Sequence, residues 1–285
     1  MLFENASAEL ALLLFTLLVP TGVMALALMA CVRGFFATDA KGARTADRLT
    51  SIPAVVMLVG LVCSFFHLGD PGHVFGMLTG IGHSPLSNEI LVAAIAIVIG
   101  VVYWVICLVK GLNEGGHKVF GTVLLVAAVV CAVFTGTAYA IPTIPTWDTP
   151  CNWIGQLGLA LLGGSALAAA SLALAGYELD KQASLALKAC GGIGLVVVAA
   201  VLVAQAALSA AAVSSVGVLL GSVMTDYATV GAACVVLCAA GYALFACGRV
   251  RVVPAWLGVV CVMVGLALMR VDFYGVFLSA GLAYL

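Results

Sequence analysis

The 285-residue chain has very little charge. Lysine, arginine, aspartate and glutamate together make up 8% of its residues, whereas soluble domains carry about 25%. Hydrophobic residues make up 65% of the chain, and the mean hydropathy is +1.27. A soluble fold of this length has too little interior to cover so much apolar surface, so the composition indicates an integral membrane protein. The net charge of −1 says nothing about nucleic acid, but the sequence has no basic patch to hold phosphates, so we expect no nucleic-acid partner.

Signatures of bound cofactors and catalytic metals are also missing. The sequence has no CxxCH haem-attachment motif, no cysteine cluster for an iron–sulfur centre, no HExxH and no P-loop. No histidine falls in the middle of an apolar run, so no facing pair could ligate a buried haem. We therefore expect neither haem nor metal in this protein. Nine of the ten cysteines lie in or beside apolar runs, and Cys151 is expected in a loop.

Eight apolar stretches are each long enough to cross a membrane, which takes about 20 residues in a helix. They lie at about 8–35, 46–68, 88–110, 118–140, 153–176, 183–213, 222–247 and 252–271. Small residues are frequent in them and favour close helix packing in a bilayer. The sequence predicts an all-α integral membrane protein, a bundle of eight transmembrane helices in one polytopic domain over 1–285. A four-plus-four repeat is compatible with this count, although the halves show no sequence echo.

The basic residues predict the orientation of the bundle. Ten of the eleven lie at the first, third, fifth and seventh connections, and the other three connections have none. Lysine and arginine gather on the cytoplasmic side, so both termini are predicted to lie outside the cytoplasmic membrane. No base precedes the first apolar run, so we expect a retained helix rather than a cleaved signal peptide. The eleventh base, Arg270, lies near the outer end of the last span and is followed by Asp272.

Ionisable residues gather at this predicted outer end. Three of the four histidines lie in HLGDPGHVFGMLTGIGHSPLSNEI, which starts at His67 and joins the second and third spans. His67 ends the second span, and Glu89 begins the third after Ser87 and Asn88, either of which could cap that helix. An ionisable group at membrane depth is costly and marks a functional site by default. We therefore predict that His67 and Glu89 share one site.

Other polar residues at this end have simpler explanations. Arg270 and Asp272 fit either an anchor at the membrane interface or a part of the site. Solvated loop positions are expected for four further residues: His73, His83, Asp148 and Asp226.

A histidine beside a carboxylate at the lipid edge suits quinol chemistry. Histidine changes charge near neutral pH, so it can hydrogen-bond a quinol hydroxyl and take its proton, while the carboxylate orients the histidine or accepts a proton itself. Quinol oxidation also releases two electrons. Because no cofactor is expected in this protein, the electron acceptor would belong to a partner protein on the outer face.

Four motifs carry a resemblance to a known family: HLGDP at 67–71, SPLSNEI at 84–90, IPTIPTWDTP at 141–150 and RVDFYG at 270–275. With them the whole chain resembles the membrane-anchor subunits of dimethyl sulfoxide reductase, the DmsC type. The resemblance implies anaerobic respiration, in which the anchor binds menaquinol and passes electrons to a four-cluster, ferredoxin-like iron–sulfur subunit. That subunit would supply a molybdopterin catalytic subunit on the outer face, exported by the twin-arginine route.

The resemblance also implies roles for particular residues. The histidine and glutamate of these motifs belong to the family's quinol site, which makes His67 and Glu89 the catalytic pair, and the family's anchor holds no haem. Secondary candidates for quinol contact or for docking the iron–sulfur subunit are Ser87, Asn88, Arg270 and Tyr274. The sequence departs from the family pattern at His73, His83 and Asp272, which leaves the terminal substrate open.

Two other functions stay open at this point. A redox-silent tether for extrinsic subunits explains the apolar helices but gives no reason for pairing His67 with Glu89. A small-solute transporter predicts polar or interrupted helices near the midplane. Few such features are present: Gln205, Ser209, Pro20 and Pro53.

Overall fold

Helices are the only regular secondary structure in the part of the protein that the computed structural model describes, residues 2–36, 41–66, 76, 78–144, 146–211 and 226–276. Eight helical segments there are long and apolar enough to cross a membrane, which confirms the predicted number. The second of them, Ala43–Phe65, combines α3 and α4. The elements are α1 (Leu2–Ala8), α2 (Leu10–Phe35), α3 (Ala43–Leu49), α4 (Ser51–Phe65), η2 (Leu78–Gly80), α6 (Pro85–Val109), α7 (Glu114–Thr137), α8 (Cys151–Leu174), α9 (Lys181–Ala211), α11 (Tyr227–Ala246) and α12 (Val252–Gly275).

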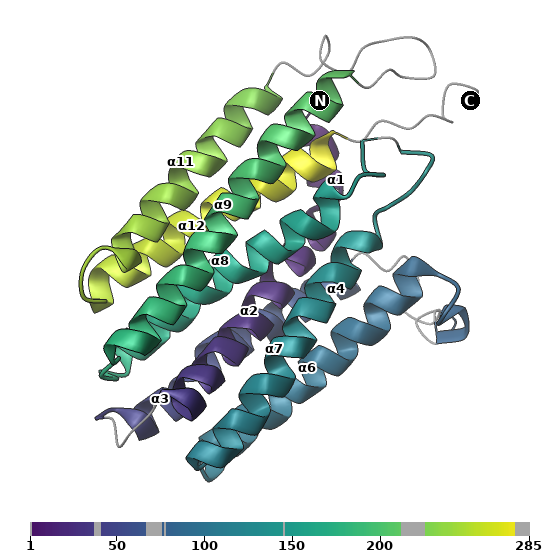
Figure 1. Ribbon diagram of the computed structural model, residues 1–285. Helices are drawn as coiled ribbons and strands as arrows, with labels where there is room; N and C mark the ends of the chain where they lie inside the picture. Colours follow the sequence, from purple (N-terminus) through teal and green to yellow (C-terminus); the bar gives the residue numbers. More distant parts are fainter. Residues whose placement is uncertain are drawn as a thin grey trace.

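Helices α2 and α8 form the centre of the bundle (Figure 1). In their most apolar windows, 83% and 78% of the residues are buried within the protein, whereas the other six spans bury 28% to 39%. The outer helices expose large aliphatic side chains such as Val98, Val126 and Val196. These exposed apolar faces are suited to contact with lipid acyl chains, because such a surface is not stable against water.

The two halves of the protein pack in the same order. Helix α2 packs against α4 and α7, as α8 packs against α9 and α12, and α6–α7 and α11–α12 are neighbouring pairs (Figure 1). The halves meet through a direct contact between α2 and α8. The packing is therefore a four-plus-four arrangement, although the sequences of the halves do not show it.

Glycines let these helices approach one another closely. A Cβ atom at Gly22 of α2 would lie 2.7 Å from the carbonyl oxygen of Pro53 in α4. A Cβ at Gly121 of α7 would lie 2.9 Å from the backbone nitrogen of Cys31 in α2. Both distances are too short for a methyl carbon, so the packing of α4 and α7 on α2 requires glycine at these positions.

Two expectations about helix starts are wrong. The third span begins at Pro85, and its cap is Ser84, whose Oγ accepts a hydrogen bond from the Ser87 backbone nitrogen at 3.4 Å. Neither Ser87 nor Asn88 is the cap, because proline is well suited to the first helical position and sets the start there. Cys151 is buried at the first position of α8 rather than in a loop.

The last helix is longer than expected. Helix α12 continues to Gly275 instead of ending at 271, so Arg270, Asp272 and Tyr274 all lie within it and are buried. An interfacial anchor formed by Arg270 and Asp272 is therefore excluded. The tail from 277 onwards lies outside the described residues.

We name the two ends of the bundle after buried acidic residues. The Glu89 end, at the upper right of Figure 1, contains the starts of α6, α8 and α11 and the ends of α7, α9 and α12. The Asp47 end contains α3 and the short connections α6–α7, α8–α9 and α11–α12.

Candidate functional site

Glu89 is a buried acid close to the start of α6, with 2% of its surface exposed. Its Oε1 atom has no hydrogen-bond partner within the described residues. Its carboxyl group interacts with the hydroxyl of Thr135 on α7 and with the charge of Arg270 on α12. Burying a charged or polar group without partners is costly. The unpartnered oxygen is therefore a candidate position for binding a ligand.

Arg270 is buried beside this acid and is held by contacts on two sides. Its Nε donates to Thr16 Oγ1 on α2 at 3.1 Å. Its Cζ lies 4.3 Å from the centre of the Phe273 ring and 4.9 Å from that of Tyr274, within cation–π range. Its Nη2 has no hydrogen-bond partner in the described part of the protein. One nitrogen of a well-positioned guanidinium therefore remains able to donate to a ligand.

Two tyrosines extend the group towards the connection between α7 and α8. The Tyr274 hydroxyl donates to the Tyr139 hydroxyl at 2.9 Å and lies 3.4 Å from Thr16 Oγ1. Tyr139 is close enough to Glu89 and Arg270 to interact electrostatically with both side chains. Burial raises the pKa of the Tyr139 phenol well above its ordinary value. Tyr139 therefore keeps its proton at physiological pH and can donate a hydrogen bond.

Gln156 of α8 completes the group from the centre of the bundle. Its Nε2 donates to the Thr16 carbonyl oxygen at 2.9 Å, and its Oε1 is buried with no described partner. Helices from both halves of the protein thus contribute to one polar group. We call it the Glu89 cluster, and its members are Thr16, Glu89, Thr135, Tyr139, Gln156, Arg270 and Tyr274.

Of the predicted site residues, the structure brings Glu89, Arg270 and Tyr274 together. Asn88 is on the same helix as Glu89, but its Oδ1 accepts a hydrogen bond from the Gly82 backbone nitrogen at 2.7 Å and so holds the preceding turn. Ser87 is buried beneath that turn.

The predicted histidines are less informative. His67 and His73 lie outside the described residues, so the pairing of His67 with Glu89 stays a prediction. His83, Asp148 and Asp226 are exposed, as expected for solvated loop residues.

Four members of the cluster were not predicted from the sequence: Thr16, Thr135, Tyr139 and Gln156. Thr16 and Gln156 are isolated polar residues within the apolar runs of α2 and α8, and that isolation was the available signal. Their meeting with Arg270 depends on which faces of α2, α8 and α12 pack together, which residue spacing within one helix does not reveal.

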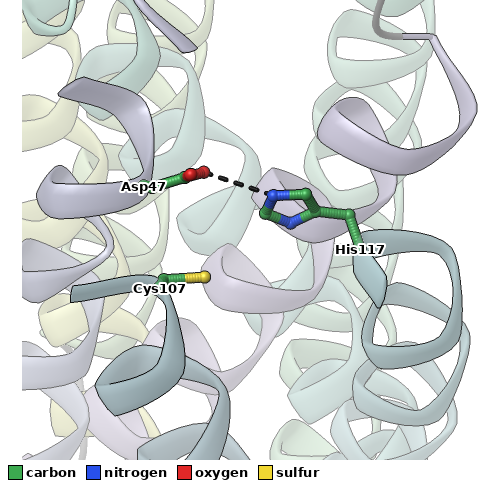
Figure 2. A group of neighbouring side chains, drawn as sticks. All are labelled: Asp47, Cys107 and His117. Carbon is green, nitrogen blue, oxygen red and sulfur yellow. Dashed lines mark ion pairs between the residues drawn. The ribbon is translucent and has the colours of Figure 1, made fainter. Parts of the chain in front are cut away.

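A second buried polar group lies at the Asp47 end (Figure 2). Asp47 Oδ1 is 3.1 Å from Arg33 Nε and 3.3 Å from His117 Nε2. The His117 contact is an ion-pair approach rather than an aligned hydrogen bond. The other ring nitrogen of His117 lies 3.1 Å from the Tyr103 hydroxyl. This group was not predicted, because His117 stands among charged residues in the sequence and Asp47 stands among bases.

The same group has spacing that could suit a metal. Potential ligand atoms of Asp47, Cys107 and His117 lie within 4.8 Å of one another (Figure 2). However, Arg33 already pairs with Asp47, and its positive charge opposes a cation at that oxygen. We interpret the group as an ion-pair network that joins α2, α3, α6 and α7.

The fold and the Glu89 cluster together define a multi-pass helical membrane protein with a buried polar site at one end. The chain belongs to the DMSO reductase anchor subunit (DmsC) family, whose sequence profile matches residues 3–276. The resemblance expected from the four motifs is therefore confirmed.

Relatives with assigned names agree with this family. The protein is 29% identical over 239 residues to the YnfH subunit of an anaerobic dimethyl sulfoxide reductase of Escherichia coli K12, an overlap of 80% of this protein and 81% of the relative. It is also 29% identical over 235 residues to the C subunit of anaerobic dimethyl sulfoxide reductase from the same organism, with the same coverage. The C subunit of the Haemophilus influenzae enzyme is 28% identical over 168 residues, which is 58% of each protein.

Proposed function

We propose that this protein anchors a dimethyl sulfoxide reductase-type complex in the cytoplasmic membrane and oxidises menaquinol at the Glu89 end. The observation that carries the proposal is the Glu89 cluster, in which a buried acid lies beside a buried arginine and each has an atom without a partner. A purely structural pair would be expected to satisfy these atoms. Membership of a reductase anchor family supplies the redox context.

The cluster offers the groups that quinol oxidation needs. A quinol hydroxyl would donate to Glu89 Oε1, and Arg270 Nη2 would donate to a quinol oxygen and stabilise the negative charge that develops as the proton leaves. His67 would bind the other hydroxyl and accept its proton. Ser87 and Tyr274, which are both buried, would shape the site.

The electrons would leave to partner subunits. Two electrons would pass to an iron–sulfur subunit docked at the Glu89 end and from it to a molybdopterin catalytic subunit. The anchor would need no haem or metal of its own, because quinol is its substrate and the partner's clusters are the electron acceptor. The names of the relatives support a reductase as the destination.

The Glu89 end would face the outside. Ten of the eleven lysines and arginines lie at the opposite, Asp47 end or its connections, which the positive-inside rule assigns to the cytoplasm. Quinol protons would then be released on the side where the reductase consumes protons, so turnover would move little net charge. Stoichiometric proton uptake from the cytoplasm during turnover would contradict this orientation of the site.

The proposal is tested by binding a fluorescent 4-hydroxyquinoline N-oxide, a quinol analogue, to membranes that contain the assembled complex. We expect Glu89→Gln and His67→Ala to weaken binding by about tenfold or more, as for loss of a hydrogen bond to a charged group. Both variants should also lose quinol-driven reductase activity while keeping activity with a reduced dye that feeds the partner subunits directly.

The matched control is Asp148→Asn, which removes a carboxylate that is exposed at the same end. It should bind and turn over as the wild type does. Normal analogue binding and normal quinol turnover in both site variants would refute the site and favour a redox-silent tether.

A further inference from the structure

A small polar cavity lies next to the Glu89 cluster, among α8, α9, α11 and α12. Its volume is about 20 Å³, which is enough for a water molecule and far too small for a quinol headgroup. Its polar lining comes from all four helices: Asn152, Gln205, Tyr227, Arg270 and Asp272. We call it the Asp272 cavity.

The cavity is surrounded by buried polar atoms that lack partners. Asp272 is 1% exposed, and neither of its carboxylate oxygens has a hydrogen-bond partner in the described part of the protein. The Tyr227 hydroxyl and Asn152 Oδ1 lack partners there as well. Native proteins leave few such atoms, and ordered water is the usual explanation when a polar cavity adjoins them. The geometry therefore points to a hydrated chamber.

Within the described residues, no basic side chain forms an ion pair with Asp272. Gly231 of α11 also approaches it, and a Cβ there would lie 3.3 Å from Asp272 Oδ2. The absence of a side chain at Gly231 leaves room for the carboxylate. A carboxylate in this position needs a proton or water to offset its burial.

The titratable groups that face Asp272 are few. Helix α11 contributes Tyr227 and Cys234, α8 contributes Cys151, and Arg270 is on the same helix as Asp272. The α9 contribution, Gln205, does not titrate. Phenols and thiols ordinarily lose protons only above neutral pH, and arginine keeps its proton. Asp272 is therefore the one carboxylate among the described residues around this cavity.

Two contacts join the cavity to the Glu89 cluster. Arg270 lines the cavity and also interacts with the Glu89 carboxyl group. Asn152 lines the cavity and donates through Nδ2 to the Tyr139 carbonyl oxygen at 3.5 Å. The cavity is also close to the end of the bundle, since Cys151 and Tyr227 are the first residues of α8 and α11.

We propose that Asp272 and the water of this cavity carry protons from the quinol site to the outer surface. The inference rests on the proposed quinol oxidation. When a quinol becomes a quinone, two O–H bonds break, two electrons pass one at a time to the partner's iron–sulfur clusters and two protons are released. A proton moves through water to a carboxylate oxygen of Asp272 and then to bulk water outside, which regenerates the carboxylate for the next proton.

The test compares Asp272→Asn with Asp226→Asn in the assembled complex in membranes. Asparagine keeps the shape of the side chain but cannot accept the proton, and Asp226 is an exposed carboxylate at the start of α11. We expect Asp272→Asn to lower quinol-driven turnover by at least about tenfold, with a larger solvent deuterium isotope effect, since proton transfer becomes limiting. Binding of the hydroxyquinoline N-oxide and reduced-dye activity should not change, and Asp226→Asn should behave as the wild type.

A spectroscopic readout tests the assignment independently of rate. The quinol-minus-quinone infrared difference spectrum of the wild type should contain a carboxylic acid C=O band that shifts in D₂O. Asp272→Asn should lose this band and Asp226→Asn should keep it. Tyr227→Phe, which removes one hydroxyl from the cavity, should lower turnover in the same direction but less.

If Asp272→Asn has the same turnover and the same isotope effect as the wild type, the proposed role of Asp272 in proton transfer is overturned. The quinol site would remain intact, because N-oxide binding reports that site separately. If Asp272→Asn does not assemble, two other results would overturn the role of Asp272 in proton transfer. One is the absence of any carboxylic acid band in the wild-type spectrum, and the other is unchanged turnover in Tyr227→Phe. Failure of the wild-type complex to bind the N-oxide would overturn the proposed function, and this inference with it.

Discussion

At the scale of single residues, the charge interaction between Glu89 and Arg270 is the feature on which the site depends. Both side chains are 2% exposed, and they come from α6 and α12, which belong to different halves of the protein. Each charge offsets part of the cost of burying the other. Removing one of the two side chains therefore leaves a buried charge without an opposite charge, whereas removing both charges removes that cost of burial.

This charge interaction predicts a non-additive result. Arg270→Met keeps much of the side-chain length but removes the charge, and we expect it to destabilise the protein by about 3–5 kcal/mol. The double variant Arg270→Met/Glu89→Gln should be less destabilised than the sum of the two single variants. Thermal unfolding of the purified complex measures each free-energy change. Strictly additive costs would mean that the two side chains do not interact.

At the scale of helices, backbone contact between neighbours depends on glycine. Gly22 lies against α4, where an added Cβ would meet the Met57 Cβ at 2.7 Å and the Pro53 carbonyl oxygen at 2.7 Å. Backbone atoms cannot move aside as the end of a flexible side chain can. A single methyl group at this position must therefore push α4 away from α2.

We expect Gly22→Ala to lower the unfolding temperature of the complex, because overpacking in a close-packed interior commonly costs about 1–3 kcal/mol. The matched control is Gly115→Ala in α7, where the nearest atom to an added Cβ is Asn113 Oδ1 at 3.8 Å. That control should be neutral or slightly stabilising, since alanine favours a helix over glycine. Equal effects of both substitutions would show that the α2–α4 contact is not tight.

At the scale of the whole molecule, the two ends of the bundle differ in chemistry. The Glu89 end carries buried polar atoms without partners, and the Asp47 end carries a paired Arg33–Asp47–His117 network. This difference fits a protein that binds its ligand at one end and is held together at the other. The proposed orientation places the two ends on opposite sides of the membrane, which can be tested in cells.

Cysteine labelling should place the two ends on opposite sides of the membrane. Cys247 is exposed at the α11–α12 connection of the Asp47 end, and Asp148 is exposed at the Glu89 end. In intact cells, a membrane-impermeant maleimide should modify Asp148→Cys in a Cys247→Ser background and should not modify Cys247 in the wild type. Cys247 should react after the membrane is permeabilised. The reverse pattern would invert the proposed orientation.

The membrane class, the eight helices and the family follow from the amino-acid sequence alone. Runs of about 20 apolar residues can exist stably only as spanning helices, so counting such runs predicted the helices to within a few residues. Helix ends were less predictable: Ser84 rather than Ser87 caps α6, and α12 continues past residue 271, because caps and packing at the ends set these limits.

Which polar residues meet one another is set by the packing of the helices. Glu89 and Arg270 could be selected from the sequence because charges are rare in apolar runs, but Thr16, Tyr139 and Gln156 could not be assigned to them. The same holds for Asp47 with His117 and for Asp272 with Tyr227, which are separated by 70 and 45 positions in the sequence. Their proximity arises from the rotation and depth at which different helices pack, which depend on small residues throughout the bundle and not on the spacing within any one helix.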